Sequence, residues 1–75
     1  MPALPVMKPQ AVVKAFEKIG WEVARQKGSH IIMTKKGHIA TLSIPRHPEV
    51  ARGTLRTLIA RAGITVDQFL KSSGK

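Results

Sequence analysis

Apolar positions follow two different periods along the chain, and the change between them separates predicted helices from predicted strands. The first apolar series recurs at helical spacing, at Val12, Phe16 and Ile19. This series predicts an amphipathic helix at about residues 9–19. We expect Gly20 to end the helix and Trp21 to pack back on Phe16, because glycine readily adopts the positive φ found at such ends.

Between the first helix and Pro45 the sequence alternates between apolar and polar positions and contains two turn signals. It predicts three strands, at about residues 22–27, 30–35 and 38–44. Gly28-Ser29 is typical of a two-residue hairpin, in which the glycine supplies the positive φ of a type II′ turn. Lys36-Gly37 is the second turn signal. Pro45 closes the third strand because it has no N–H to donate to a sheet.

The two turns predict which strand residues lie opposite one another, and therefore which side chains share a face. The pairs expected in the first hairpin are Lys27 with His30, Gln26 with Ile31, Arg25 with Ile32 and Ala24 with Met33. Those in the second are Met33 with Ala40, Ile31 with Leu42 and His30 with Ser43. The core side would carry Ala24, Ile31, Met33, Ala40 and Leu42. The open side would carry Arg25, Lys27, His30, Thr41 and Ser43, with Ile32 and Ile39, to which we assign no polar role.

The C-terminal part of the chain predicts a basic loop and two further helices. Residues 45–52 form the proline-stiffened loop, and a second amphipathic helix follows at about 54–62, ended by Gly63. Thr65 and Gln68 have the spacing of a capping box at the start of a short last helix, which runs to about Lys71. We expect an α+β domain at residues 9–71, with helices covering one face of a three-stranded antiparallel sheet. Residues 1–8 would be a flexible arm and residues 72–75 a frayed end.

The charge of the chain points to an anionic partner. Its 75 residues include 13 Lys+Arg and 4 Asp+Glu, a formal net charge of +9. Nucleic acid is the first expectation, and an acidic protein is a compatible second partner. The N-terminal residues lack the pattern of a signal peptide, and no apolar run approaches the roughly 20 residues of a membrane span, so we expect a cytoplasmic protein.

Several kinds of chemistry are disfavoured by the residues available. The chain has no cysteine, its four carboxylates are scattered over different predicted elements, and its three histidines match no zinc signature. No phosphate-binding loop, dinucleotide fingerprint or nucleophile elbow occurs. We therefore expect neither a metal nor an organic cofactor.

His30 is the candidate for metal-free chemistry, because an imidazole among cations can act on RNA. A neutral histidine can take the proton of the 2′-OH while Lys or Arg stabilises charge on the phosphate, and DNA lacks that hydroxyl. The alternative is an ordinary exposed histidine in an RNA-binding module without catalysis. His38 is expected to be solvated at its turn. His47 suits a phosphate contact and a loop hydrogen bond equally.

The order of several short motifs resembles a known toxin family. The matching pieces are Gly20-Trp21, Gly28-Ser29-His30, Pro45-Arg46-His47, Gly53-Thr54-Leu55-Arg56, Ala62-Gly63-Ile64 and Phe69. In this order and spacing they resemble the HicA toxins of bacterial and archaeal toxin–antitoxin systems. The resemblance implies a double-stranded-RNA-binding-like α-β-β-β-α fold, cleavage of mRNA that arrests translation, and a catalytic histidine at position 30. It also implies a HicB-type antitoxin that masks this face.

The resulting expectation is a toxin that acts as an endoribonuclease, with a non-catalytic RNA-binding module as the alternative. The expected RNA contacts are Arg25, Lys27, Gly28, Ser29, Arg46, His47, Arg52 and Arg56. The antitoxin is expected to be acidic where it touches the toxin, and the free toxin to be a monomer.

Overall fold

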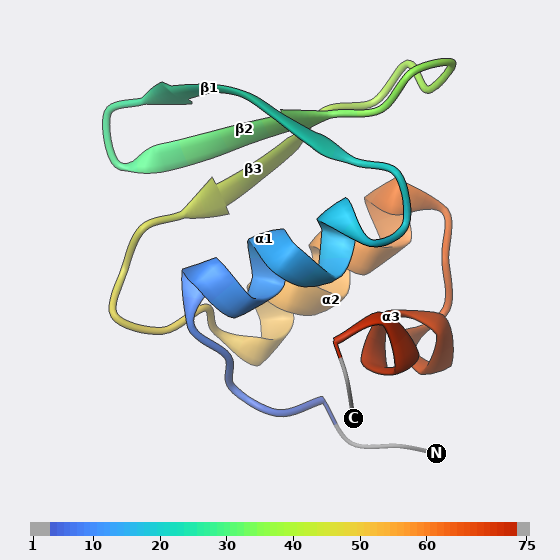
Figure 1. The fold of residues 1–75 in the computed structure, drawn as a ribbon. Helices are drawn as coiled ribbons and strands as arrows, with labels where there is room; N and C mark the ends of the chain where they lie inside the picture. Colours follow the sequence, from blue (N-terminus) through green and yellow to red (C-terminus); the bar gives the residue numbers. More distant parts are fainter. Residues whose placement is uncertain (1–3, 74–75) are drawn as a thin grey trace.

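Three strands form one layer of the molecule and three helices form the other (Figure 1). The computed structural model describes residues 4–73. In chain order the elements are α1 (Pro9–Glu17), β1 (Glu22–Lys27), β2 (His30–Thr34), β3 (Leu42–Pro45), α2 (Arg52–Ala62) and α3 (Val66–Ser72). The strands are antiparallel in the order β1-β2-β3. This confirms the predicted α+β fold, which is consistent with a double-stranded-RNA-binding-like domain carrying one extra helix.

The C-terminal end of α1 has the geometry predicted from Gly20 and Trp21. Gly20 has φ 102° and its N–H donates to the carbonyl of Glu17 at 3.2 Å, while the N–H of Trp21 donates to Phe16 at 3.1 Å. These two bonds form a Schellman motif, which satisfies the last carbonyls of the helix. The Phe16 and Trp21 rings then meet edge to face with centroids 6.3 Å apart. The helix itself ends at Glu17, two residues before the expected end.

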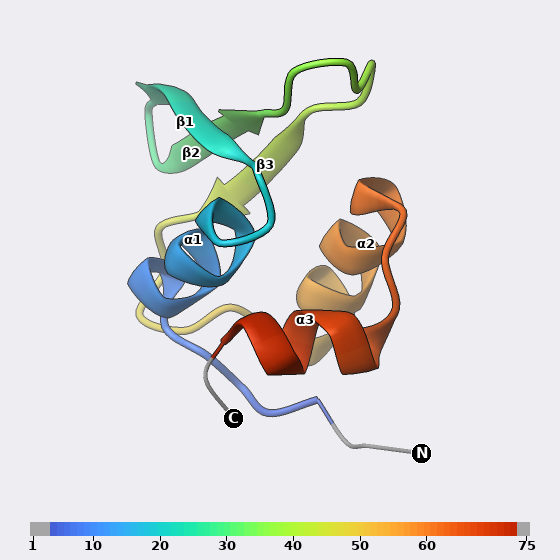
Figure 2. The same ribbon diagram turned by 45° about the vertical axis from the view of Figure 1, so that its right-hand side comes forward.

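The helices lie on one side of the sheet (Figure 2), and the buried side chains of both layers form the core. Its largest fully buried side chains include Trp21, Phe16, Phe69, Met33, Leu42 and Ile44. Phe16 of α1 and Phe69 of α3 are in contact, with ring centroids 5.0 Å apart. All six residues of β1 are exposed, so the helices cover this edge strand only in part. The opposite face of the sheet is left open.

The first hairpin has the predicted register near its turn and departs from it farther away. Lys27 pairs with His30, Gln26 with Ile31 and Arg25 with Ile32, as expected. Met33, however, pairs with Val23 instead of Ala24, because a β-bulge inserts one extra residue between Val23 and Arg25. The predicted Ala24–Met33 pair is therefore wrong, whereas the pairs closest to His30 are confirmed.

The second hairpin is shifted by two residues from the predicted register. His30 pairs with Pro45, Ile31 with Ile44, Ile32 with Ser43 and Met33 with Leu42. The predicted pairs of Met33 with Ala40, Ile31 with Leu42 and His30 with Ser43 are wrong. A shift of two keeps each side chain on its face, and it buries Ile44 where the predicted register placed only Leu42 and Ala40.

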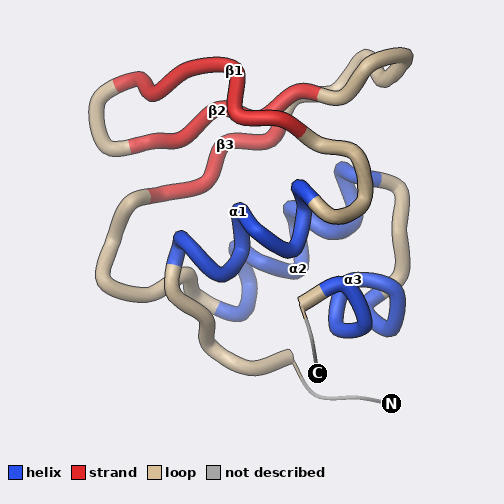
Figure 3. The backbone as a smooth tube through the Cα atoms, viewed as in Figure 1, coloured by secondary structure: helices blue, strands red, loops and turns tan. Residues whose placement is uncertain are grey.

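The shift arises because β3 begins at Leu42 and not near residue 38. A wide loop connects β2 to β3 and projects beyond the sheet (Figure 3). The predicted turn is present inside this loop, where Gly37 has φ 82° and the N–H of His38 donates to Lys35 at 3.0 Å. Ile39 is fully exposed in the same loop and lies outside the ladder.

The helices after the sheet agree with the predicted signals, with small changes at their ends. Helix α2 begins at Arg52, two residues before the expected start, and ends at Ala62, where Gly63 caps it with φ 76°. The capping box of α3 is confirmed: the Gln68 N–H donates to Thr65 Oγ1 at 3.1 Å and the Thr65 N–H donates to Gln68 Oε1 at 2.8 Å. Ser72 and Ser73 were expected to fray, but their hydroxyls donate to carbonyls of the last turn. Residues 74–75 lie outside the described residues.

The expected loose arm is packed on the domain over its described part, residues 4–8. Leu4 is 3% exposed and belongs to the core, and Met7 forms a bridge with Val50 whose N–H donates to the Met7 carbonyl at 2.7 Å. Arg52 Nε donates to the Leu4 carbonyl at 3.0 Å. Residues 1–3 of the predicted arm lie outside the described residues. The arm thus closes the core beneath the start of α2.

Candidate nucleic-acid interface

His30 occupies the first position of β2, next to the turn that joins it to β1. Gly28 in this turn has φ 57°, and none of the described non-glycine residues has a positive φ, so the turn has the signs of type II′. No atom lies within 4 Å of where a Cβ on Gly28 would stand, which leaves the turn open to a ligand. Ser29 extends the sheet by one bond, because its carbonyl accepts the Arg46 N–H at 2.7 Å.

The face of the sheet away from the helices carries His30 together with two cations. Residues directly opposite each other in antiparallel strands share a face, with Cβ atoms about 4.5–5.5 Å apart. Lys27 and Pro45 lie opposite His30, and Arg25 and Ser43 lie opposite Ile32. We call Arg25, Lys27, His30, Ile32 and Ser43 the open sheet face. The structure thus brings Arg25 and Lys27 to the predicted face of His30.

The charge on the open sheet face is positive near His30, and an acidic residue is found only at the opposite end of the strands. Glu22 is paired with Thr34, at the other end of β2 from His30. Arg25, Lys27, His30 and Ser43 are exposed, whereas Ile32 is half-buried. Within the described residues, no side chain holds the His30 imidazole by a hydrogen bond. An incoming anion can therefore contact both the imidazole and the Lys27 ammonium.

Arg46 and His47 lie at the same end of the sheet but on its other side. They are exposed in the loop after β3 and line a cavity together with Gln26 and Ile31. Gln26 and Ile31 are opposite each other, one step along the strands from Lys27 and His30, so they face the helices. Sequence reasoning identified Arg46 and His47 as candidates but missed Gln26. A polar residue at a core-facing strand position was the signal that could have revealed it.

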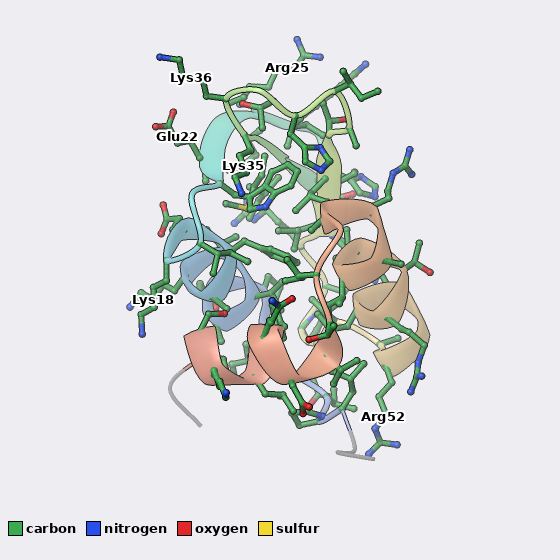
Figure 4. All side chains as sticks on the ribbon, turned by 90° about the vertical axis from the view of Figure 1, so that its right-hand side faces the viewer. Lys18, Glu22, Arg25, Lys35, Lys36 and Arg52 are labelled. Atoms are coloured by element: carbon green, nitrogen blue, oxygen red, sulfur yellow. The ribbon has the colours of Figure 1, made fainter. Side chains whose placement is uncertain are left out.

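Arg52 and Arg56 belong to helix α2 and are not brought to His30. Figure 4 shows Arg25 and Arg52 at opposite ends of the molecule. The Arg52 guanidinium is engaged with the Leu4 carbonyl, and Arg56 is exposed on the helix. The residues predicted to contact RNA are therefore divided among the open sheet face, the adjoining end of the sheet and α2.

His38 is a structural residue and not the solvated side chain that its turn suggested. It is half-buried, its ring lies against Trp21 with centroids 5.0 Å apart, and its Nδ1 accepts the Ala40 N–H at 3.2 Å. Trp21 is 1% exposed, and its indole N–H has no hydrogen-bond partner within the described structure. His38 therefore covers one edge of the core and fixes the loop before β3.

Two further features concern residues 4–73, the part of the chain that the structure describes. In that range no three His, Asp or Glu side chains come together in a way that could hold a metal ion. None of the helices described has both the length and the apolar character needed to cross a bilayer.

The fold and the open sheet face define a small basic α+β domain with one histidine among cations. The family model described as the HicA toxin of bacterial toxin–antitoxin systems matches residues 10–64. The chain therefore belongs to the HicA toxin family, and its class is the toxin component of a toxin–antitoxin system, with an antitoxin as partner. No curated protein and no solved structure gives a significant match.

Proposed function

We propose that this toxin is a metal-independent endoribonuclease that cleaves mRNA and arrests translation, with His30 as general acid/base. The observation that carries the proposal is the position of His30, exposed at the end of the sheet, directly opposite Lys27 and on the same face as Arg25. A phosphodiester held by these two cations would lie within reach of the imidazole. Family membership supports the toxin role, and the surface chemistry supports an RNA substrate.

The proposed reaction uses the nucleophile that RNA itself carries. The neutral His30 imidazole accepts the proton of the 2′-OH, and the 2′ oxygen then attacks the adjacent phosphorus. The bond from phosphorus to the 5′ oxygen breaks, which leaves a 2′,3′-cyclic phosphate on one fragment and a 5′-OH on the other. The 5′ oxygen takes a proton from water or from a second group. Lys27 and Arg25 stabilise the charge that develops on the phosphate oxygens.

A non-catalytic RNA-binding module is the competing function, since the same basic face would hold phosphates without cleaving them. The two candidates differ only in what happens to the bound strand. The net charge supports both candidates equally. His30 favours the enzyme, because it puts a side chain that can accept a proton directly opposite Lys27 on the open sheet face, and membership of the toxin family favours it as well.

The proposed partners follow from the same surface. An antitoxin of the HicB type, with acidic residues at its contact, would neutralise the toxin by covering the open sheet face. The free toxin would act as a monomer on mRNA in the cytoplasm.

The test is cleavage of unmodified RNA by the purified chain in excess EDTA. We expect cleavage to persist, because the proposed chemistry needs no metal, and the fragments to end in 2′,3′-cyclic phosphate and 5′-OH. His30→Ala should be inactive under the same conditions, while Lys36→Ala, in the distant β2–β3 loop, should cleave as the wild type does. Loss of wild-type cleavage in EDTA that Mg²⁺ or Mn²⁺ restores would contradict the mechanism.

A further inference from the structure

A cavity of about 510 Å³ lies at the same end of the sheet as His30, but on the face that is turned towards the helices. It is formed by the start of α1, by β1 and β2, and by the loop after β3. Figures 1 and 2 show these segments meeting at one end of the molecule. The lining residues are Pro9, Gln10, Gln26, Ile31, Arg46, His47 and Pro48. We call this the sheet-end cavity.

The lining of the sheet-end cavity suits an unpaired nucleobase better than a phosphate alone. Gln10 and Gln26 each offer both an amide donor and an amide acceptor, which is what the edge of a base requires. His47 and Arg46 supply a ring and a guanidinium plane, the two kinds of surface on which unpaired RNA bases stack. No carboxylate lines the cavity. A phosphate could use only the donors of this lining, whereas the edge of a base uses both its donors and its acceptors.

The strand register places the sheet-end cavity next to His30. Gln26–Ile31 is the pair next to Lys27–His30, and successive strand residues point to opposite faces. The Arg46 N–H donates to the Ser29 carbonyl at 2.7 Å, so the loop that carries Arg46 is fixed against the turn beside His30. The cavity and the imidazole therefore lie on the two sides of the same strand end.

We propose that the sheet-end cavity binds one unpaired base of the RNA strand, next to the phosphodiester that lies at His30. The inference rests on the proposed function, because it assumes that the strand crosses the open sheet face. An RNA strand that bends around this end of the sheet places a phosphate beside His30 and the adjoining base beside Gln26. A base engaged in a duplex cannot enter, so the substrate is single-stranded RNA. Gln10 and Gln26 select the base, and Arg46 and His47 hold its faces.

The test measures binding and does not depend on catalysis. A short single-stranded 2′-O-methyl RNA has no free 2′-OH and cannot be cleaved by the proposed route. Its affinity for the wild-type chain is compared with that of oligomers in which one nucleotide at a time is abasic, using fluorescence anisotropy. We expect one position to be distinctive, with binding weaker by roughly 5- to 150-fold when its base is missing, the range that base stacking produces.

Variants then locate the effect within the protein. In Arg46→Ala and in His47→Ala, the penalty for the abasic position should fall towards onefold, because the base has lost its stacking surface. Arg61→Ala removes the same charge from α2 and should keep the full penalty. Affinities that are equal for every abasic position, or a penalty that persists in both cavity variants, would overturn the inference. Failure of the proposed function is recognised separately, as intact unmodified RNA after incubation with the wild-type chain.

Discussion

At the scale of single residues, His30 and His38 show how exposure separates a residue available for chemistry from one used for packing. His30 is exposed on the open sheet face, whereas His38 is half-buried against Trp21 and accepts the Ala40 N–H through Nδ1. Truncation of His38 would uncover the edge of the core. Truncation of His30 removes only a group that faces solvent or substrate.

We therefore predict that His30→Ala loses RNA cleavage by about 10²–10⁴-fold, the usual contribution of a general acid or base. The free energy of unfolding should change by less than about 0.5 kcal/mol, as for most exposed substitutions. RNA affinity should fall little, since the proposed phosphate contacts come from Lys27 and Arg25. The measurements are the cleavage rate, the melting temperature and RNA binding on the same preparation. Near-normal cleavage by a folded variant would point to His47 instead.

Cationic side chains on the open sheet face and those on α2 should differ in how much they contribute to the salt dependence of RNA binding. Replacing Lys27 with alanine should flatten the slope of log K against log[salt] by about 0.7, the value for one phosphate on a single strand. Arg52→Ala should leave that slope unchanged, because Arg52 lies at the opposite end of the molecule from Arg25 of the open sheet face, where its Nε–H donates to the Leu4 carbonyl. It should instead lower the stability by about 1 kcal/mol, the net contribution of one hydrogen bond. An unchanged slope for Lys27→Ala would move the binding face elsewhere.

The residues around His30 could be predicted because their arrangement is local, and Arg52 could not because its partner is remote. A two-residue turn fixes which residues face His30 within a few positions of the chain. The Arg52–Leu4 bond joins residues 48 apart in sequence, which no local pattern indicates. The sheet-end cavity was missed for the same reason, since it unites α1, the strands and the loop after β3.

At the scale of elements, the residue types that mark the ends of helices predicted the structure correctly. The strand registers were predicted correctly only close to a tight turn. The Schellman motif after α1 and the capping box of α3 were both predicted from residue type. The bulge between Val23 and Arg25 contains no glycine or proline that would have indicated it in the sequence. The second hairpin was shifted because Ile44 and Leu42 are larger than Ala40 and gain more by being buried.

Two glycines should respond in opposite directions to the same substitution. Gly20 has φ 102°, and a Cβ there would stand 3.2 Å from the Lys35 side chain, so Gly20→Ala should lower the stability by about 1–2 kcal/mol. Gly53 lies in α2 without a positive φ, and no atom is within 4 Å of its Cβ position. Gly53→Ala should therefore raise the stability by about 0.5–1 kcal/mol, since alanine loses less backbone freedom on folding.

Thermal unfolding of the two variants checks this pair. For a domain of this size, 1 kcal/mol corresponds to about 4–8 °C in melting temperature. The melting temperature should fall for Gly20→Ala and rise for Gly53→Ala. A shift in the same direction for both would show that the helix ends are not formed as described. RNA cleavage at low temperature should be unchanged in both, since neither glycine lies on the open sheet face.

At the scale of the whole molecule, the helices and the N-terminal arm bury one face of the sheet and leave the other available. A chain of this size buries only about 60–65% of its unfolded surface, so each core side chain contributes a large share of the stability. Leu4 is part of that core, although proline-rich sequence around it resembles a loose arm. Its position beneath α2 depends on Val50 and Arg52, which are close to it only in the folded chain.

The last prediction tests whether the arm is a structural part of the domain. Leu4→Ala should lower the free energy of unfolding by an amount near the lower end of the about 2–5 kcal/mol typical of buried leucines, because a terminal segment can relax into the space. Val6 lies in the same arm but is 40% exposed, and Val6→Ala should cost less than about 0.5 kcal/mol. Chemical denaturation of both variants provides the comparison. Equal and small effects would mean that the arm is loose in solution, as its sequence suggests. A large effect confined to Leu4 would make the arm a part of the folded core at the start of α2.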